Sequence, residues 1–490
     1  MSTHPLDRPI TRRRLIKIGA AAGAGILLSA ACNPKAQPTL SPSVTPTSLS
    51  RSPQATSTPK PTLPPTLQPE PIQPNPQVPA STPALQRMGF GARPGDLEAF
   101  NALGSSDPER LEAYIEQQLH PESIVDEDLE AHYAAAQFVT LEKSLEQLVD
   151  EHIINNPFDD NDDQHWRWYV LPLQDTYQAT FLRAVYSRKQ LFELLVDFWH
   201  NHFNVYGDQD DIAPLFASYD RDVIRANVLG NFRQMLEAVA SHPSMLYYLN
   251  NNSNSDAGPN ENWARELFEL HTLGAENYLG VRDPNSVPTD ENGLAVGYVD
   301  NDVYEAARCF TGWRVDDDIW EGESDVGMSG NFLYYRPWHD RFNKFILGRY
   351  IPADQEDMKD GRDVMDMLAA HPGTARFISR KLCRRLISDT PPESVVEMAA
   401  QVFLQAQADP DQLKQVVRAI LLSDEFSQTW GEKIKRPFET AVAMLRALNA
   451  EFTRLPDGAR WTFEMMGQPL FGRRPPDGYS DVKETWANSM

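Results

Sequence analysis

The sequence predicts a mainly α-helical body that follows a signal peptide and a disordered linker. In most segments after Pro83, apolar residues recur three and four positions apart, which is the spacing of amphipathic helices. Strictly alternating segments are rare, so regular strands are too few for a doubly wound sheet. Fifteen of the 51 residues from 33 to 83 are proline, a composition that opposes folding.

Residues 1–32 have the pattern of an export signal. The stretch "TRRRLIKIGAAAGAGILLSAAC", residues 11–32, begins with arginines and continues with an apolar run too short to span a membrane. It resembles a twin-arginine signal, with Arg12, Arg13 and Leu15 at the expected positions. At its end, Cys32 resembles the lipid-modified cysteine of bacterial lipoproteins, although Ser29 stands where an aliphatic residue is usual. We expect export and a lipid anchor on Cys32, with ordinary cleavage nearby as the alternative.

Residues 33–83 are rich in Pro, Thr, Ser and Gln and have too little apolar surface to fold. Their prolines favour extended polyproline II, which at ~3.1 Å per residue could reach roughly 150 Å. We therefore expect a tether between the anchor and the body, and no other contact of the protein with the membrane.

Residues 84–490 form the predicted helical body. We expect Pro243 and Pro372, each after a histidine, to lie in the first turn of a helix. Between 283 and 351 the chain is rich in Gly, Asp, Pro and aromatic residues, and we expect irregular structure with a hairpin and one helix at 300–313. The other clearest helical segments are residues 181–199, 231–240, 375–387, 393–406, 411–426 and 436–448.

Charge and cysteine usage exclude several classes of protein. The formal net charge is −24, whereas binding to nucleic acid or to an anionic membrane needs basic surface patches, so we expect no nucleic acid partner. No CxxC motif occurs, and the only cysteines are Cys32, Cys309 and Cys383, which excludes a disulfide framework, a zinc ribbon and covalent haem. Cys309 and Cys383 have apolar neighbours and should lie in the core.

Several long motifs resemble those of the bacterial family called domain of unknown function 1800, over about residues 84 to 480. The resemblance implies a bacterial, often exported protein without an assigned activity. The family usually continues well past "GQPLFGRRPPDGYSD", so it also implies a chain that lacks its last helices. The motifs are "DFWHNHFNV", "GNFRQMLEAVASHPSMLYYLNN", "NENWARELFELHTLG", "VYEAARCFTGW", "WHDRFNKFILG", "HPGTARFISRKLCRRLISD" and "KRPFETAVAMLRAL".

The motif "NENWARELFELHTLG", residues 260–274, concentrates polar groups on one arc of a helix. At ~100° per residue, Glu261, Arg265, Glu266 and Glu269 lie on that arc, and His271 lies on the other flank of the apolar stripe. An arc that faces water needs no further explanation. The few lysines nearby and the polar loop before the helix favour an arc that faces inward. Glu266 and His271 are then candidates for general acid and base, with Arg265 neutralising one carboxylate.

Histidines near this arc suggest a metal site. If "DFWHNHF" stays helical, His200 and His202 point about 200° apart and cannot share a metal. If the helix ends near residue 199 and the chain extends, both lie on one face, as paired ligands do. With His271, Glu266 and His339 they would suit one divalent transition metal, such as zinc, iron or manganese.

Two classes of function follow. The first is an exported metal-dependent enzyme, and a hydrolase fits best because an open metal site activates water. The second is a non-catalytic surface or assembly protein whose polar motifs are structural networks. An inward arc would need positive charge, which we expect from Arg265, His339, Lys344 or the metal.

Overall fold

The structure is a computed structural model that describes residues 78–159, 161–291, 293–317, 328–456 and 458–487. The chain divides into two units, Met1–Gln73 with Asp159–Asp162 and Pro74–Phe158 with Asp163–Met490, and every helix and strand named below lies in the second. The predicted signal and most of the predicted linker lie outside the described residues. Helix α2 begins at Ser81, within the last residues of the span assigned to the linker.

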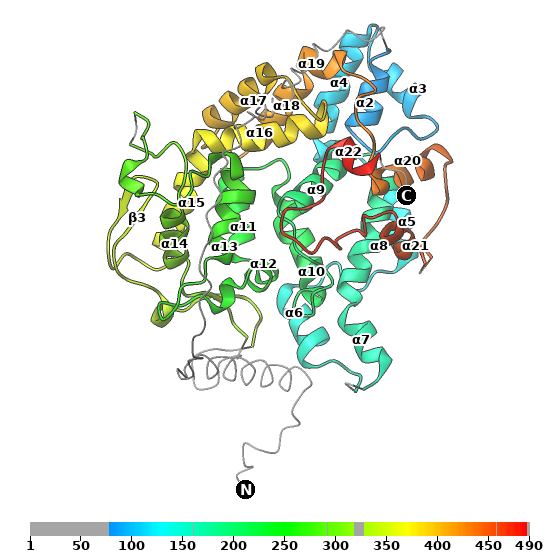
Figure 1. Ribbon diagram of the computed structural model, residues 1–490. Coiled ribbons are helices and arrows are strands. Elements are labelled where there is room, and N and C mark those ends of the chain that lie inside the picture. The colour runs from blue at the N-terminus through cyan, green and yellow to red at the C-terminus, as the bar shows by residue number, and fades with distance from the viewer. Residues whose placement is uncertain (1–77, 160, 292, 318–327, 457, 488–490) are drawn as a thin grey trace, which may run out of the picture. The chain divides into compact units, whose positions relative to one another are not determined.

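The second unit is mainly helical, as predicted (Figure 1). The first helices are α2 (Ser81–Arg87), α3 (Asp96–Asn101), α4 (Asp107–Gln118), α5 (Glu127–Ala136), α6 (Leu145–Val149), α7 (Asp163–Tyr169), α8 (Leu171–Tyr186) and α9 (Gln190–His202). Then follow α10 (Phe216–Ser218), α11 (Phe232–Ser241), α12 (Pro243–Tyr248), α13 (Asn262–Glu266), α14 (Asp300–Cys309) and α15 (Lys359–Ala370). The last are α16 (Pro372–Leu386), α17 (Glu393–Gln405), α18 (Gln412–Leu421), α19 (Asp424–Gln428), α20 (Pro437–Ala447), α21 (Ala459–Met465) and α22 (Lys483–Trp486).

Among the described residues, three segments are π-helices, a rare form that is frequent at functional sites. They are η2 (Asp150–Ile154), η4 (Tyr219–Arg225) and η6 (Leu267–Thr272). Short 3₁₀ turns occur at η1 (Pro121–Ser123), η3 (Ala213–Leu215), η5 (Asn251–Ser253), η7 (Ala275–Asn277), η8 (Pro284–Ser286) and η9 (Arg336–Trp338).

Both predicted proline starts are confirmed, and the histidine before each proline explains why. Pro243 and Pro372 open α12 and α16. The Nδ1 atom of His242 accepts a hydrogen bond from the Ser244 amide at 3.2 Å, and that of His371 accepts one from the Gly373 amide at 2.8 Å. Each imidazole therefore acts as a helix N-cap for an amide that the helix itself leaves unpaired.

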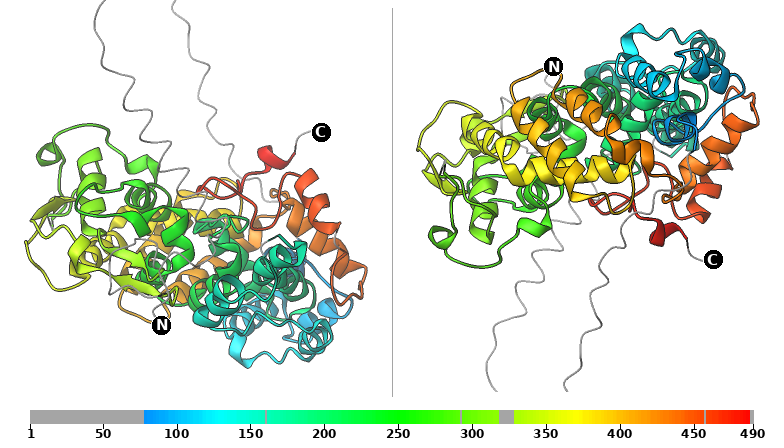
Figure 2. Two further views of the ribbon diagram at one scale, coloured as in Figure 1. Left: turned by 90° about the horizontal axis from the view of Figure 1, so that it is seen from below. Right: turned by 90° about the horizontal axis from the view of Figure 1, so that it is seen from above.

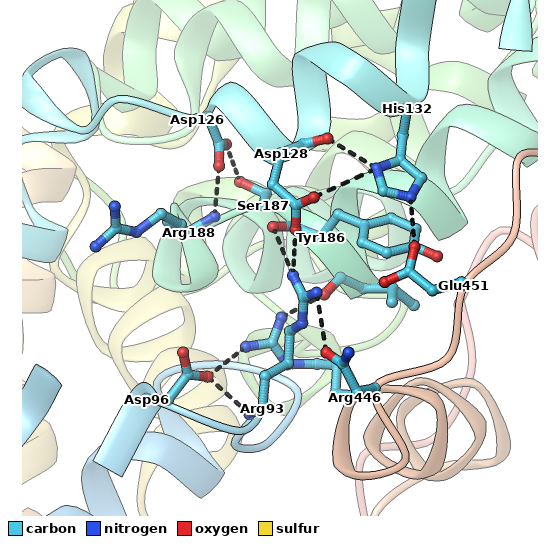
Figure 3. Close-up of polar contacts among 12 residues, drawn as sticks. Arg93, Asp96, Asp126, Asp128, His132, Tyr186, Ser187, Arg188, Arg446 and Glu451 are labelled. Carbon is cyan, nitrogen blue, oxygen red and sulfur yellow. Dashed lines mark hydrogen bonds and ion pairs between the residues drawn. The ribbon is translucent and has the colours of Figure 1, made fainter. Parts of the chain in front are cut away.

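The helix predicted at 181–199 is interrupted, because α8 ends at Tyr186 and α9 begins at Gln190. The interruption is held by Asp126, which accepts hydrogen bonds from the Ser187 hydroxyl at 2.5 Å and from the Arg188 amide at 2.8 Å (Figure 3). A carboxylate 61 residues away thus satisfies the backbone at the break. Apolar spacing within the segment contains no sign of this partner.

A buried arginine joins the N-terminal helices to α20 in the same region (Figure 3). Arg446 donates to the carbonyl oxygens of Gly91 at 2.5 Å and Val185 at 2.6 Å, and it pairs with Asp96 at 2.9 Å. Nearby, the His132 ring stacks on Tyr186 with ring centroids 3.6 Å apart. The hydrogen bonds of Arg446 satisfy the carbonyl groups of Gly91 and Val185, which would otherwise be buried without these partners.

The span 283–351 contains two small antiparallel sheets, β1 (Trp313–Val315) with β2 (Phe332–Tyr334) and β3 (Lys344–Ile346) with β4 (Arg349–Ile351). Helix α14 ends at Cys309, earlier than the predicted 313. Gly312 has φ 80°, and a Cβ there would lie 2.7 Å from the Tyr335 carbonyl oxygen, so the chain turns at this glycine into β1.

One continuous core runs through the second unit, and its largest buried side chains include Trp199, Trp263 and Trp313. Helices α16, α17 and α18 pack side by side, as Figures 1 and 2 show. Helix α16 also contacts η6, and this contact brings the basic run of α16, "RKLCRRL" at residues 380–386, against the polar motif of residues 260–274. Cys309 and Cys383 are buried, as predicted. No helix within the described ranges has both the length and the apolarity of a membrane span.

Candidate functional site

His200 and His202 lie at the end of α9, which stays helical through His202, so the two side chains diverge and the extended alternative is wrong. His200 is buried, and its Nε2 lies 2.9 Å from Oδ1 of Asp220 on η4. Arg183 also pairs with Asp220, at 3.0 Å. Burial alone would raise the pKa of Asp220, but Arg183 and His200 hold it far below its usual range. His200 is thus part of a satisfied buried ion network.

His202 points toward the polar motif. Its Nε2 donates to the carbonyl oxygen of His271 at 3.1 Å, and its Nδ1 accepts from the Lys381 ammonium at 2.8 Å. Because a carbonyl can only accept, these contacts select the tautomer with the proton on Nε2. Burial, and then the charge of Lys381, lower the pKa of His202 well below its ordinary value, so the ring is neutral.

His271 is fully buried within η6, and neither of its ring nitrogens has a hydrogen-bond partner among the described residues. Its ring centroid lies 5.2 Å from that of Phe203, 5.6 Å from that of Trp263 and 6.1 Å from that of His202. Burial lowers its pKa to about 3. A buried, neutral imidazole with two unsatisfied nitrogens is costly for stability, and it lies beside His202, which donates to the backbone carbonyl of His271.

The polar arc is half-exposed, so the prediction that it faces inward is wrong. Glu261 and Arg265 form an ion pair at 2.9 Å, with side chains 40% and 37% exposed. The helix is α-helical only to Glu266 and then becomes η6, so a wheel at a constant angle misplaces the residues beyond it. Glu269 is likewise half-buried.

Glu266 differs from the other acids of the arc in its raised pKa. Its side chain is half-buried, and no ion pair or hydrogen bond to its carboxylate is found among the described residues. Burial, then the neighbouring charge of Glu269, raises its pKa to about 7, and Arg265 only partly offsets this. Asp477, from the loop near the C-terminus, acts in the same direction.

His339 belongs to a separate network. It contacts the carbonyl oxygen of Thr311 through Nδ1 at 3.0 Å and Asp360 through Nε2 at 3.3 Å. Lys344 is fully buried and pairs with the same Asp360 at 2.6 Å. Arg308 binds both oxygens of Asp340, the residue after His339. His339 and Lys344 therefore do not supply positive charge to the polar arc, contrary to the prediction.

The structure does not bring the five predicted metal ligands together. His202 and His271 are neighbours, whereas His200 and His339 are bound to their own carboxylates, Asp220 and Asp360. Within the described ranges, no group of three or more His, Cys, Asp or Glu side chains is arranged to hold a metal ion.

Sequence reasoning missed Lys381, whose ammonium donates to His202 and whose charge acts on His271. In the basic run "RKLCRRL", Lys381 points to His202, and the buried Arg385 pairs with Glu439 at 2.9 Å. The two are four residues apart, hence on one face of α16, and that spacing is the signal that could have found them. Burial lowers the pKa of Lys381 to about 8.

Comparisons with known proteins add a family and no activity. No curated protein matches the chain, and no solved structure matches it. One family model matches residues 83–490, most of the chain, which confirms the resemblance drawn from the motifs. The chain therefore belongs to the family described as "Protein of unknown function (DUF1800)".

Proposed function

We propose that this chain is an exported, lipid-anchored enzyme that uses Glu266 as the general acid and base of a hydrolytic reaction. The location is supported by the arginines of residues 11–14, the short apolar run and Cys32, all outside the described residues. The Pro-rich stretch of residues 33–83 gives such an anchor the reach of a tether.

The observation that carries the catalytic part is the state of Glu266. A half-buried carboxylate normally gains an ion pair or several hydrogen bonds, because desolvation of an unpaired charge is costly. Glu266 has neither among the described residues, and two further acids, Glu269 and Asp477, act on it. Perturbed carboxyl groups of this kind cluster at functional sites.

Such a group has a defined chemistry. Near neutral pH, a carboxyl with a pKa of about 7 is present in both forms. The acid form can give a proton to a leaving group, and the carboxylate can take one from an attacking water. Asp477 lies within electrostatic range of Lys381 as well, since its charge acts on both Glu266 and Lys381.

A metal-dependent form of this hypothesis needs at least three converging ligands. The described residues contain no such group, so the proposal uses only the carboxyl group and water. Metal analysis of the purified protein tests the predicted ion directly, because one bound ion would give about one equivalent of metal per chain.

The second candidate is a non-catalytic surface or assembly protein. The observation that favours it is the structural use of His200 and His339, each held by a buried or nearly buried aspartate with a cationic partner. Networks of this kind fix the packing of elements without chemistry.

The test compares the full-length protein with Glu266→Gln and, as a matched control, Glu276→Gln, an exposed glutamate ten residues further on. Each is assayed on chromogenic esters, glycosides and phosphate monoesters. We expect hydrolysis of one class by the native protein, a loss of ~10²–10⁴-fold in Glu266→Gln and no change in Glu276→Gln. Equal rates for Glu266→Gln and the native protein would refute the role of Glu266, and inactivity on all three classes would favour the second candidate.

A further inference from the structure

An open groove of about 470 Å³ lies between α13, the loop at residues 281–284 and the first turn of α14. It adjoins the outer side of the polar arc, and Glu266 does not line it. The polar side chains that do are Glu261, Arg265, Arg282, Asp300, Asn301 and Tyr304.

The groove has no net formal charge, since two acids and two arginines line it. Arg265 bridges the two acids, at 2.9 Å from Glu261 and 3.5 Å from Asp300. All three of these side chains are more than a third exposed, so they are accessible to a ligand. The carboxylates would repel a polyanion, and the guanidinium groups would repel a polycation. The balanced charge of the groove therefore favours neither class of ligand.

The hydrogen-bonding groups of the groove discriminate between ligand classes better than its charge does. Guanidinium groups only donate and carboxylates only accept, and the amide of Asn301 does both. Arg282 is exposed, and no ion pair or hydrogen bond of its side chain is found among the described residues. A ligand that carries many hydroxyl groups, each a donor and an acceptor, matches this mixture of fixed donors and acceptors.

Val281, Pro284 and Tyr304 supply the remaining surface of the groove. The Tyr304 side chain is 42% exposed, which leaves an aromatic surface beside the polar groups. An apolar ligand would require an enclosed apolar pocket, and this groove is open and lined by charged pairs. A sugar ring instead has one face of C–H groups that can lie on an aromatic ring while its hydroxyls bond at the edge.

We propose that this groove binds a neutral oligosaccharide, with a sugar face on Tyr304 and its hydroxyls on Arg282, Asn301 and the carboxylates. The inference is independent of the proposed function, because binding is measured without turnover. If the groove binds an oligosaccharide and Glu266 is the catalytic acid, a polysaccharide bound in the groove contacts α13, the helix that carries Glu266. The substrate class is then a neutral polysaccharide.

The test is the mobility of the full-length protein in native gels that contain a soluble neutral polysaccharide, with glucan, galactomannan and xylan in turn. Dextran sulfate is the charged comparison. Variants are Tyr304→Ala, Arg282→Ala and, as the matched control, Phe342→Ala, whose ring is 74% exposed and does not line the groove. Far-UV circular dichroism and melting temperature verify that each variant is folded.

We expect at least one neutral polysaccharide to retard the native protein and Glu266→Gln alike. Tyr304→Ala should weaken the apparent Kd by about tenfold, the upper range for loss of one aromatic contact, and Phe342→Ala should not change it. Retardation by dextran sulfate alone, abolished by salt, would overturn the proposal. So would the absence of retardation by any neutral polysaccharide, or equal retardation of Tyr304→Ala and the native protein.

Discussion

Replacing Glu266 by Gln should stabilise the protein above neutral pH. The folded protein raises the pKa of this carboxyl from 4.5 to about 7, chiefly through burial. The folded state therefore binds the proton more tightly than the unfolded chain. Native stability is then lost as the pH rises from about 4.5 to about 7, and above that window the folded state bears the full cost of the buried charge.

The magnitude follows from that difference in pKa. One pKa unit corresponds to about 1.4 kcal/mol, so a rise from 4.5 to about 7 gives an upper limit of about 3 kcal/mol. Partial solvent access to a half-buried group reduces this to about 1.5–3 kcal/mol. Gln has the shape of the protonated acid and does not titrate, so the variant does not lose this stability.

The assay is urea unfolding at intervals from pH 4.5 to pH 8.5, followed by tryptophan fluorescence. The free energy of unfolding of Glu266→Gln minus that of the native protein should rise through this range and level off near pH 8. Other titrating groups cancel in the difference. Glu276→Gln, on an exposed side chain, should give a curve that is flat within about 0.5 kcal/mol. A flat curve for Glu266→Gln, or one that falls with pH, would refute the reasoning.

Three further predictions concern other parts of the chain. Burial lowers the pKa of Lys381 from 10.5 to about 8, so the stability of Lys381→Met relative to the native protein should rise by up to about 3 kcal/mol as the pH falls from 10.5 to about 8 in urea unfolding, in addition to a pH-independent loss from the missing hydrogen bond to His202. Arg446→Ala leaves the buried carbonyls of Gly91 and Val185 without their donor and should cost about 2–4 kcal/mol; a loss below about 1 kcal/mol would contradict these contacts. Cys32→Ala should move the protein from the membrane fraction to the soluble extracytoplasmic fraction, and unchanged fractionation would count against lipidation.

The helices could be predicted where apolar spacing alone decides them. Residues 393–406 and 436–448 match α17 and α20 closely, because both helices bury one stripe against a neighbour. The break between α8 and α9 could not be predicted, since it depends on Asp126, which lies 61 residues before Ser187.

The candidate site was also predictable from the sequence only in part. The motif selected from the sequence contains two residues with unusual environments, Glu266 and His271. The sequence did not predict the directions of the side chains beyond Glu266. A helical wheel with a constant angle per residue does not describe the π-helix η6, which begins at Leu267. The sequence also failed to assign partners, since the aspartate bound by His339 lies 21 residues away in the chain.

The distribution of charge around the motif argues for function over structure. His200 and His339 have the partners that a structural role requires, with each imidazole bound to a carboxylate that also binds a cation. Glu266 and Lys381 lack an oppositely charged partner among the described residues, although burial penalises the charge of both, and the ammonium of Lys381 donates to the neutral ring of His202. A fold that needed only stability would lose little if both were replaced by neutral side chains. An unpaired acid and an unpaired amine, each with a pKa near neutrality, are instead suited to moving protons.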